Sequence, residues 1–521
     1  MTPSDSGSQR IAADRGPATT HVVVVRTRHP GVDPAAREAT TQSLLAQTYP
    51  DWSLVDGPEN GAPGTVSVLP FDPPVPERAT DVLVVSAPDG AIFDVDAIAQ
   101  LVNAAHRSGA RLITWDLDLD DAGTAQPQLR FGWSPETLLS CDYTHGCFAL
   151  RRQDYLAAAA AVPGDVPLTA WSLLLHLPPD LDPTLHLPHP LTRIPALPPV
   201  DDGVAVPTID AALRHRGIPA SCVRKDGVTR LRWHPESWPR VSLLVPTRHN
   251  EPMLGPLLDS LRHTEGPSFD VVIVDNGEHT PEHEAWYQRD WGFPVRVHWW
   301  QEAPFHYGRV NNAAAGLTDA DVIVLLNDDT RVADPGWLAE LVGWAAAPGV
   351  GCAGSVLLDG DGRIQHAGVW LGIGGYAGHL FGGLRPGEDT VIGPTDWYRN
   401  TTAVTAACLA IRRELFREVG GLDERMVLCG SDVTLGLDLL ARGLRNVCSP
   451  LPGVVHLESV TRSGAPRHDQ EVSLVRYQPW HDMGDPYGNP RLSLRTTRPT
   501  LRAANEPDPV ADARHALGVI V

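Results

Sequence analysis

The chain has 521 residues, which at about 150 residues per domain allows two to four domains. Hydrophobic residues make up 42% of the chain and charged residues 20%, a globular composition that argues against a mostly disordered protein. The 63 acidic side chains outnumber the 42 lysines and arginines, and the resulting net charge of −21 argues against nucleic acid as the main partner.

Three features of the sequence concern its cellular compartment. No run of about eighteen apolar residues occurs, so no transmembrane helix is predicted. Residues 1–20 are polar and lack the apolar core of a signal peptide, and we expect them to form a flexible tail. The seven cysteines include no C-x-x-C pair, which favours reduced thiols in a cytoplasmic protein over disulfides or structural zinc.

The N-terminal half is predicted to form a parallel α/β sheet. Apolar and β-branched runs predict strands at 21–25, 81–85 and 111–115, and residues 92–108 have helical spacing. Strands that alternate with helices are typical of parallel sheets. The proline-rich stretch 178–207 is predicted to be an irregular connection, because proline disrupts helix and strand interiors.

A second α/β unit is predicted to begin at Val241, after a short helix at 209–216 and a strand pair at 222–233. The glycine-rich stretch 370–393 is expected to form loops over a site. Apolar runs in this unit predict strands at 241–245, 271–274, 295–299 and 321–326. Apolar residues at helical spacing predict helices at 254–261, 311–317, 337–345 and 431–443.

Polar residues follow three predicted strands of the second unit. These are Pro246-Thr247-Arg248, Asp275-Asn276 and Asn327-Asp328-Asp329. Ligands of open α/β sheets bind at the carboxyl ends of the strands. The carboxylate of Asp275, at the second of these strand ends, could accept hydrogen bonds from a nucleotide base or ribose. The paired acids Asp328 and Asp329, at the third, could hold Mg²⁺ or Mn²⁺ against a diphosphate. A turn or helix N-cap is the commoner fate of such a tripeptide, so its spacing alone leaves both interpretations open.

Two further polar residues have both a catalytic and a structural interpretation. Asp432 stands at a predicted helix start, where it suits a general base or simply a favourable interaction with the helix dipole. His456 ends an apolar run, where it suits a metal ligand or a hydrogen-bonded structural residue, and His366 has the same two interpretations. We expect His249 and His263 at the surface, and a hairpin turn at 359–362.

The second unit resembles the family 2 glycosyltransferases of the GT-A fold. Within the family it is similar to the rhamnosyltransferase-like, O-antigen-type branch that builds bacterial cell-surface polysaccharide. The resemblance rests on eight blocks that occur in the family's order. They are VSLLVPTRHN, FDVVIVDNG, FHYGRVNNAAAGL, VIVLLNDDTRV, GRIQHAGVWLGIGGYAGH, NTTAVTAACLAIRRELFREVGGLDE, SDVTLGLDLLARGLRNV and VVHLES.

The resemblance implies a role for each matching position. Asn327-Asp328-Asp329 stands where the family has its DxD motif, with Asp329 as a metal ligand, and His456 completes the metal and diphosphate site. Asp432 matches the catalytic base, and residues 405–408 would line the sugar and acceptor. The positions implied to bind or approach a nucleotide-sugar donor are Pro246, Thr247, Arg248, Asp275, Asn276, Arg309, Asn312, Asn327 and Asp328.

The reaction that these roles imply is a single inverting displacement. A divalent metal, Mn²⁺ or Mg²⁺, would neutralise the leaving diphosphate while Asp432 takes the proton of an acceptor hydroxyl. The implied partners are a nucleotide-sugar donor and a glycan or lipid-linked acceptor, reached in the cytoplasm or peripherally at the inner face of the plasma membrane. Thr434 and Leu457 depart from the family, which often has an acid and a second histidine there.

The N-terminal half resembles the same fold in degenerate form. Residues 43–52, 131–135, 138–140 and 149–152 resemble blocks of the family, but neither paired acids nor a base occur where the family has them. We therefore expect packing, acceptor binding or assembly as its role, while a divergent site at Asp89 and Asp94 is the less favoured alternative.

The predicted fold class is thus α/β, with two tandem GT-A-like, Rossmann-like domains. The predicted divisions are a tail at 1–20, a degenerate, non-catalytic domain at 21–235, a catalytic domain at 236–465, and a C-terminal extension at 466–521 that wraps the catalytic domain and ends in disorder. The predicted function is inverting transfer of a sugar in surface polysaccharide synthesis. The alternative is a non-catalytic protein that binds a sugar nucleotide or glycan. A nucleotidyltransferase is disfavoured, since residues 247–251 contain no glycine.

Overall fold

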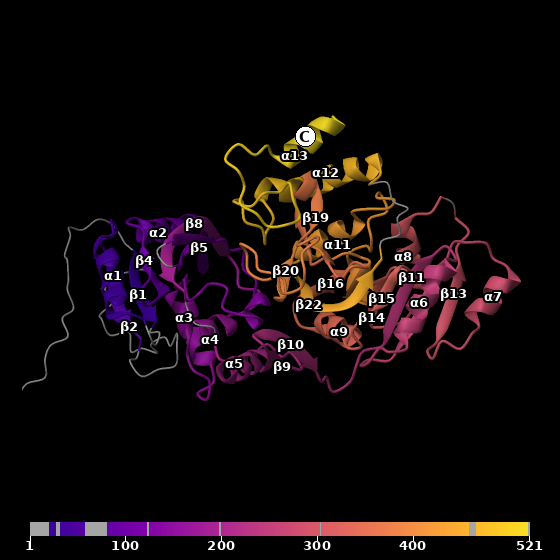
Figure 1. The fold of residues 1–521 in the computed structure, drawn as a ribbon, viewed down its shortest axis with the longest axis horizontal. Coiled ribbons are helices and arrows are strands. Elements are labelled where there is room, and N and C mark those ends of the chain that lie inside the picture. The colour runs from indigo at the N-terminus through magenta and orange to yellow at the C-terminus, as the bar shows by residue number, and fades with distance from the viewer. Residues whose placement is uncertain are drawn as a thin grey trace, which may run out of the picture. The chain divides into compact units, whose positions relative to one another are not determined.

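The computed structural model describes residues 20–27, 32–57, 81–121, 124–196, 200–302, 304–457 and 465–518. The predicted tail, apart from Thr20, and the last three residues of the predicted C-terminal extension lie outside these ranges. The described chain forms two compact units, whose elements are labelled in Figure 1. The N-unit comprises Met1–Pro127, Thr144–Leu177 and Leu181–Pro198, and the C-unit comprises Gln128–Tyr143, Pro178–Asp180 and Pro199–Val521.

The N-unit is built on one mixed sheet with strand order β2-β1-β3-β7-β5-β8-β4, and β6 pairs with β5. Its core lies between this sheet and the helices, where buried side chains such as Val22, Leu83 and Leu101 pack together. The strands are β1 (Thr20–Thr27), β2 (Trp52–Asp56), β3 (Asp81–Pro88), β4 (Ile92–Phe93), β5 (Leu112–Asp121), β6 (Thr124–Gln128), β7 (Phe148–Arg151) and β8 (Thr184–Pro195). The helices are α1 (Pro34–Leu45), α2 (Ala97–Ser108), α3 (Arg152–Ala161) and α4 (Ala170–Leu175).

The predicted irregular connection at 178–207 is wrong, because it contains the twelve residues of β8 and the start of α5 (Asp202–His215). Strand β8 pairs with β5 in parallel, but the register shifts so that Trp115 faces Leu187 and Asp116 faces Pro190. This irregularity lets the strand accommodate its prolines, which cannot donate to a regular ladder.

The C-unit contains a larger sheet with strand order β13-β12-β11-β14-β21-β16-β22-β15. Strand β17 pairs with β16 and β20 with β22, while β9–β10 and β18–β19 form separate hairpins. The main strands are β11 (Val241–Thr247), β12 (Phe269–Asp275), β13 (Val295–Trp299), β14 (Val322–Leu326), β15 (Thr330–Val332), β16 (Val350–Leu358), β21 (Cys408–Arg412) and β22 (Arg445–His456). The shorter strands are β9 (Ala220–Lys225), β10 (Val228–Trp233), β17 (Ile364–His366), β18 (Val369–Leu371), β19 (Ala377–His379) and β20 (Arg399–Thr401).

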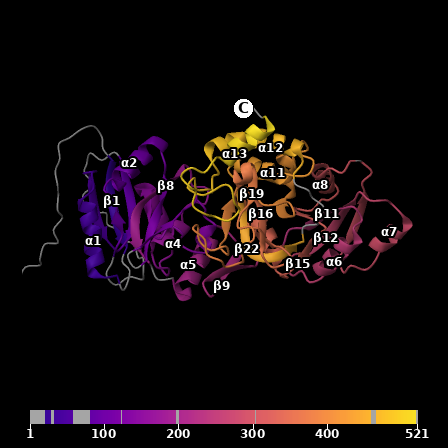
Figure 2. The ribbon, with the colours of Figure 1, turned by 45° about the horizontal axis from the view of Figure 1, so that its top comes forward.

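Helices of the C-unit pack against this sheet and carry the chain beyond it. Helices α12 and α13 lie beside α11 and β19 in both views of the molecule (Figures 1 and 2). The helices after α5 are α6 (Glu251–Leu261), α7 (Pro281–Tyr287), α8 (Tyr307–Gly316), α9 (Trp337–Ala346), α10 (Arg413–Glu418), α11 (Ser431–Leu440), α12 (Arg467–Met483) and α13 (Pro509–Leu517). Short 3₁₀ turns occur at Thr137–Leu139 and Ile373–Gly375.

The two sheets share one strand pattern. In the N-unit, β1 lies parallel to both β2 and β3, β7 runs antiparallel to β3 and β5, and β5 is parallel to β8. In the C-unit, β11, β12, β14, β21, β16 and β22 repeat these directions in the same order. The predicted α/β fold with two tandem Rossmann-like domains is therefore confirmed.

Two segments that precede the predicted domain boundary at residue 235 pack as part of the C-unit. Trp233 of β10 donates its indole N–H to buried Glu340 of α9 at 2.8 Å. Glu136, in the segment 128–143, forms a buried ion pair with Arg445 of β22, with 3.1 Å between Oε1 and Nη2. The boundary between the compact units thus differs from the predicted one, because long-range polar contacts hold both segments to the second sheet.

The buried carboxylates of Glu340 and Glu136 are both held by hydrogen bonds or ion pairs. Glu340 also accepts hydrogen bonds from Trp344, Tyr398 and Ser449 at 2.8–2.9 Å. Burial raises the pKa of Glu340 in spite of these donors. Burial would also raise the pKa of Glu136, but the charges of Arg445 and Arg216 outweigh it and lower that pKa. No helix in the described ranges is both long and apolar enough to cross a membrane.

Candidate functional site

The polar strand ends of the C-unit converge as the sequence predicts. Strand β11 is parallel to β12 and to β14, so the residues that follow these strands share one edge of the sheet. Thr247 pairs in register with Asp275. The Thr247 hydroxyl donates a hydrogen bond of 2.7 Å to Asp328 Oδ2, which joins the first strand end to the third.

Asp328 sits in an environment that disfavours its charge. Burial raises the pKa of Asp328 to about 6, and the neighbouring carboxylates of Asp329 and Asp275 contribute to the shift. The hydrogen bond from Thr247 acts in the opposite direction. A nearby cation would stabilise the ionised form of this carboxylate, because it would offset the negative charge that burial disfavours.

Asp275 is a fully buried anchor at the end of β12. Its Oδ2 lies 3.0 Å from His249 Nδ1 and accepts a hydrogen bond of 2.6 Å from the Tyr287 hydroxyl, while its Oδ1 accepts one of 2.7 Å from the Gly277 amide. These contacts occupy both oxygens. The neighbouring Asn276 donates its backbone N–H to the Thr247 carbonyl at 3.0 Å.

The prediction of a surface position is wrong for His249. Its side chain is only 6% exposed, and its ring stacks on His283 with 3.4 Å between centroids. The backbone of His249 has a φ of +50°, a left-handed conformation that a residue other than glycine adopts mainly where its surroundings enforce it. His263 is exposed, as predicted.

Asp329 and His456 form a close acid–imidazole pair. Asp329 Oδ1 lies 3.1 Å from His456 Nε2, and both residues are largely buried. Strands β15 and β22 bring them together, because Thr330 pairs in register with His456 and the Leu457 amide donates to the Asp329 carbonyl at 2.9 Å. His456 Nδ1 lies 3.2 Å from Gln365 Oε1, which fixes the orientation of the ring.

Asp432 lies in the first turn of α11 and points toward the end of β21. Its Oδ2 accepts a hydrogen bond of 3.2 Å from the Ala406 amide, and its Oδ1 accepts one of 2.9 Å from the Val433 amide. Gly430, the N-cap of this helix, has a φ of +91° and no capping side chain. A Cβ there would lie 2.7 Å from the Tyr477 hydroxyl, so only glycine fits this close approach.

Helix α12 contributes a residue that the sequence analysis missed. The carboxylate of buried Asp469 accepts three successive backbone N–H bonds, from Val427 and Leu428 at 2.8 Å and from Cys429 at 3.0 Å. These three residues lead directly into Gly430 and α11, so Asp469 holds the loop that presents Asp432. An acid three residues inside a polar helix gives no sign of this role in the sequence.

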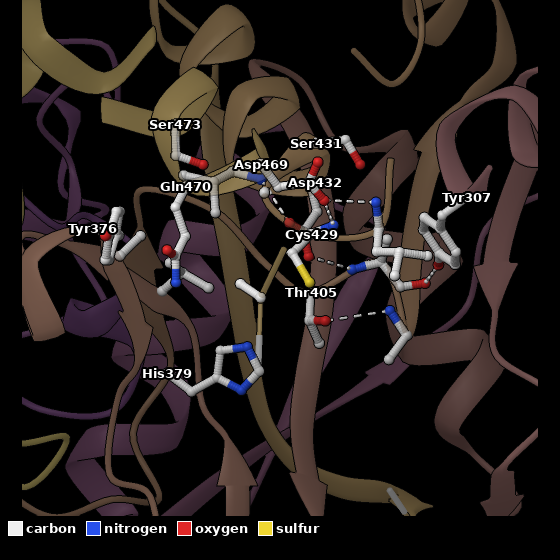
Figure 3. A pocket seen from close by; sticks show the side chains of 18 of the residues that line it. Tyr307, Tyr376, His379, Thr405, Cys429, Ser431, Asp432, Asp469, Gln470 and Ser473 are labelled. Atoms are coloured by element: carbon white, nitrogen blue, oxygen red, sulfur yellow. Dashed lines mark hydrogen bonds between the residues drawn. The ribbon is translucent and has the colours of Figure 1, made fainter. Parts of the chain in front are cut away.

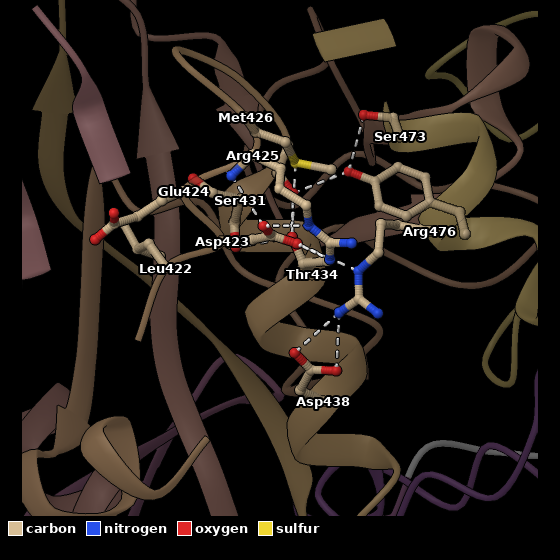
Figure 4. A network of polar contacts seen from close by, with 12 residues as sticks. Leu422, Asp423, Glu424, Arg425, Met426, Ser431, Thr434, Asp438, Ser473 and Arg476 are labelled. Atoms are coloured by element: carbon tan, nitrogen blue, oxygen red, sulfur yellow. Dashed lines mark hydrogen bonds and ion pairs between the residues drawn. The ribbon is translucent and has the colours of Figure 1, made fainter. Parts of the chain in front are cut away.

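A polar network fastens α12 to α11 and to the loop before it (Figure 4). Arg476 Nη2 lies 3.2 Å from both carboxylate oxygens of Asp438, and Arg476 Nε lies 3.3 Å from Asp423 Oδ2. Asp423 is also bound by Arg425, at 2.6 Å. The Tyr477 hydroxyl donates to the Gly430 carbonyl at 2.9 Å. The C-terminal extension therefore builds part of the site.

A cavity of about 300 Å³ lies beside Asp432. Figure 3 shows side chains from α12, the β18–β19 hairpin and the start of α11 around it. Of the predicted site residues, the cavity is lined by Asn327, Asp432 and His456. Thr405, Ala406 and Ala407, from the stretch predicted to contact sugar and acceptor, line it too. The stretch predicted to form loops over a site contributes Tyr376, Ala377 and His379, part of them in strand β19.

Of the nine predicted donor residues, only Asn327 lines this cavity. Pro246 is buried in β11 and Arg248 is exposed. Arg309 Nε lies 3.5 Å from Glu424 Oε2 with half its side chain in solvent. The Asn312 side chain contacts the carbonyl and the amide of Leu422 at 2.9 and 2.8 Å, so it braces the loop before α11. Their roles in donor binding stay predictions.

His366 has a structural environment. It is fully buried and accepts backbone N–H bonds from Gly368 at 3.2 Å and Thr405 at 3.4 Å. Burial holds the pKa of His366 well below its usual value, so the ring is neutral. The turn at 359–362 joins β16 to β17, which confirms the predicted hairpin turn.

The residues that suit a divalent metal are Asp329 and His456. No group of three or more histidines, cysteines and carboxylates in the described ranges is arranged to hold a metal. A two-residue site nevertheless fits Mg²⁺ or Mn²⁺, since such ions take one or two protein ligands and complete their shell with substrate phosphates and water. The carboxylate and imidazole at 3.1 Å supply that donor set.

The fold and site define an α/β domain with acids gathered at the carboxyl ends of parallel strands, beside a polar cavity. Residues 242–420 match the model of the family "Glycosyl transferase family 2". This region is thus a family 2 glycosyltransferase domain, which confirms the resemblance seen in the sequence. Helices α11 and α12 follow the matched region.

The chain is also similar to two named bacterial proteins. It is 36% identical over 410 residues to the O-antigen biosynthesis protein RfbC of Myxococcus xanthus, covering 75% of this chain and 32% of that protein. It is 30% identical over 154 residues to the N-acetylglucosaminyl-diphospho-decaprenol L-rhamnosyltransferase of Mycobacterium tuberculosis, covering 26% of this chain and 47% of that enzyme. The chain thus spans about a third to a half of the length of these relatives.

Among solved structures, the chain overlaps with GalNAc-T7 in complex with UDP, GalNAc and Mn²⁺. The TM-score is 0.40 at 16% identity, over 50% of this chain and 51% of that one. An overlap at this level supports no conclusion about the site.

Proposed function

We propose that the C-unit transfers a sugar from a nucleotide-sugar donor to a hydroxyl of a glycan or lipid-linked acceptor, with inversion, in cell-surface polysaccharide synthesis. The observation that carries the proposal is the cavity that His456 and Asp432 both line, next to the strand ends where Asp329 contacts His456 and Asp328 contacts Thr247. The family match and the similarity to RfbC support the reaction class and the process.

Each acid has a separate task in this proposal. Asp329 and His456 would hold a divalent metal, which supplies Lewis-acid stabilisation of the departing diphosphate. Asp328, oriented by Thr247, adds negative charge that favours metal binding. Asp432 accepts the proton of the acceptor hydroxyl as its oxygen attacks the anomeric carbon, and the amide bonds from Ala406 and Val433 hold its carboxylate in place.

We place this reaction in the cytoplasm, with peripheral contact to the inner face of the membrane where lipid-linked acceptors are found. The N-unit, in this proposal, carries no reaction of its own. Its Asp89 is buried and ion-paired with Arg37 at 3.2 Å, and Asp94 lies beyond the same turn at a separate position.

Release of nucleotide from a panel of nucleotide sugars, in the presence and absence of Mn²⁺, tests the proposal. We expect metal-dependent release with at least one donor, lost in Asp329→Ala. If the wild-type protein with Mn²⁺ releases no nucleotide, yet binds nucleotide sugars as tightly as Asp329→Ala does, the protein is a binding protein and the enzymatic proposal is rejected.

A further inference from the structure

The cavity beside Asp432 has an unusual balance of charge. Among the described residues that line it, none is an arginine or a lysine, and two are aspartates, Asp432 and Asp469. Its two imidazoles belong to His379 and His456, and His456 is already paired with Asp329. The metal proposed at His456 faces the donor diphosphate, so a negatively charged ligand beside Asp432 would meet carboxylates without a guanidinium or ammonium to offset them.

One wall of the cavity is the inward face of α12. Gln470, Ser473 and Tyr477 lie three and four residues apart, so they share a face of the helix. Figure 3 shows Gln470 and Ser473 across the cavity from Asp432. The amide of Gln470 and the hydroxyl of Ser473 each offer a donor and an acceptor, which is what sugar hydroxyls require. Tyr376 adds an aromatic surface.

We propose that this cavity is an acceptor subsite that takes the uncharged sugar ring whose hydroxyl Asp432 deprotonates, and that α12 is the element that selects it. The inference rests on the proposed function, because it identifies the substrate class of the same site. The volume of about 300 Å³ is at the lower end of small-molecule pockets, which suits a single ring rather than a lipid chain.

The position of α12 supports its role in selection. The region that matches the family ends at residue 420, and both α11, which carries Asp432, and α12, which forms this wall, follow it. Asp469, at the start of the same helix, holds the loop that carries Asp432. Acceptor recognition and the placement of the base thus share one helix. Uronic acids and other anionic sugars are excluded from the subsite.

Binding of matched neutral and anionic glycosides tests the proposal. The probes are the p-nitrophenyl glycosides of glucose and glucuronic acid, and of galactose and galacturonic acid, titrated into the full chain and followed by saturation-transfer NMR. Gln470→Ala and Gln470→Glu remove the amide and add a charge. Gln478→Glu adds the same charge on α12 outside the cavity and serves as the control. Binding of a nucleotide sugar with Mn²⁺ is measured in parallel.

We expect at least one neutral glycoside to bind about tenfold more tightly than its uronide, and both Gln470 variants to weaken it about tenfold while Gln478→Glu does not. Equal binding of neutral and anionic partners, no binding of any neutral glycoside, or Gln470 variants that weaken only the nucleotide sugar would each overturn the proposal. Nucleotide release measured on the same samples reports on the proposed function separately, because it needs no acceptor.

Discussion

The N-unit and the C-unit follow one strand pattern but differ where the strands end. Leu83 pairs with Arg151 as Val322 pairs with Arg412, at the starts of α3 and α10. Counting forward from these pairs, Asp89 stands where the C-unit has Asp328, and Gly90 where it has Asp329. Asp89 is 0% exposed and lies 3.2 Å from Arg37 and 3.5 Å from Arg26, so guanidinium groups occupy its oxygens.

The two units also differ at the start of the helix that precedes the last strand of the shared pattern, which is α4 before β8 in the N-unit and α11 before β22 in the C-unit. In the N-unit, Thr169 and Ser172 form a capping box at the start of α4. In the C-unit, Gly430 leaves α11 without a capping side chain and Asp432 occupies the first turn. At these positions the N-unit pairs Asp89 with arginines and caps the backbone of α4. At the matching positions the C-unit has Asp328 and Asp432, and neither has an arginine or lysine among the partners described above. This difference agrees with the proposal that the C-unit, and not the N-unit, carries the reaction.

The largest effect is expected for Asp432→Asn. An asparagine keeps the shape of the side chain and one of the two bonds to the Ala406 and Val433 amides through its single oxygen, but it cannot take a proton, so transfer should fall by about 10³-fold. Initial rates of nucleotide release with acceptor present measure this. An unchanged melting temperature is the control for folding, and a rate within tenfold of the wild type would remove Asp432 from the role of base.

Matched substitutions of Asp89 and Asp328 should separate stability from activity. Asp89→Asn leaves buried Arg26 and half-buried Arg37 short of a counter-charge, so we expect a loss of about 3 kcal/mol in the free energy of unfolding and no change in rate. Chemical denaturation and initial rates measure the two effects. Loss of transfer in a fully folded Asp89→Asn protein would mean that the N-unit takes part in the reaction.

Asp328→Asn should raise the stability of the metal-free protein, the opposite of the effect expected for Asp89→Asn. The folded carboxyl has a pKa of about 6 against 3.8 for the free group, so its contribution to stability is present below about pH 4 and is lost as the pH rises to 6. Above that, ionised Asp328 costs up to about 3 kcal/mol, which asparagine removes. We expect the metal-free variant to be more stable at pH 7 but not at pH 3.5, and to bind Mn²⁺ more weakly.

Glu136→Gln tests which unit the segment 128–143 belongs to. The substitution leaves the buried guanidinium of Arg445 without its carboxylate, so the C-unit should lose about 3 kcal/mol of stability. Thermal melting followed by tryptophan fluorescence measures the change. If the loss were confined to a transition that leaves the C-unit folded, the segment would not be integral to it.

Asp469→Asn should lower the rate without altering donor binding. The asparagine can no longer accept three N–H bonds, so the loop from Val427 to Cys429 loosens and Asp432 is held less precisely. We expect kcat to fall about tenfold with the donor KM unchanged, and partial recovery in Asp469→Glu. Glu471→Gln on the same helix is the control, and a raised donor KM with normal kcat would contradict the positioning role.

The sequence predicts what depends on local pattern. The apolar runs of β11, β12 and β14 and the acids that follow them could be read directly, because parallel strands bring their carboxyl ends together. Helix α12 could not be assigned a role, since two of its buried residues are the polar Asp469 and Ser473 and no apolar stripe marks the buried face. The place of the segment 128–143 depends on contacts between residues far apart in the sequence, such as the ion pair of Glu136 with Arg445, 309 positions away, and the hydrogen bond between Ser134 and Asn400.

The smallest effect tests the helix starts. Thr169→Ala removes half of the capping box at α4, and a cap of this kind contributes about 1 kcal/mol. We expect the N-unit to melt a few degrees lower while transfer by the C-unit is unchanged at temperatures where both units are folded. A fall in rate at those temperatures would show that the structure of the N-unit affects the site of the C-unit. Both units would then contribute to catalysis.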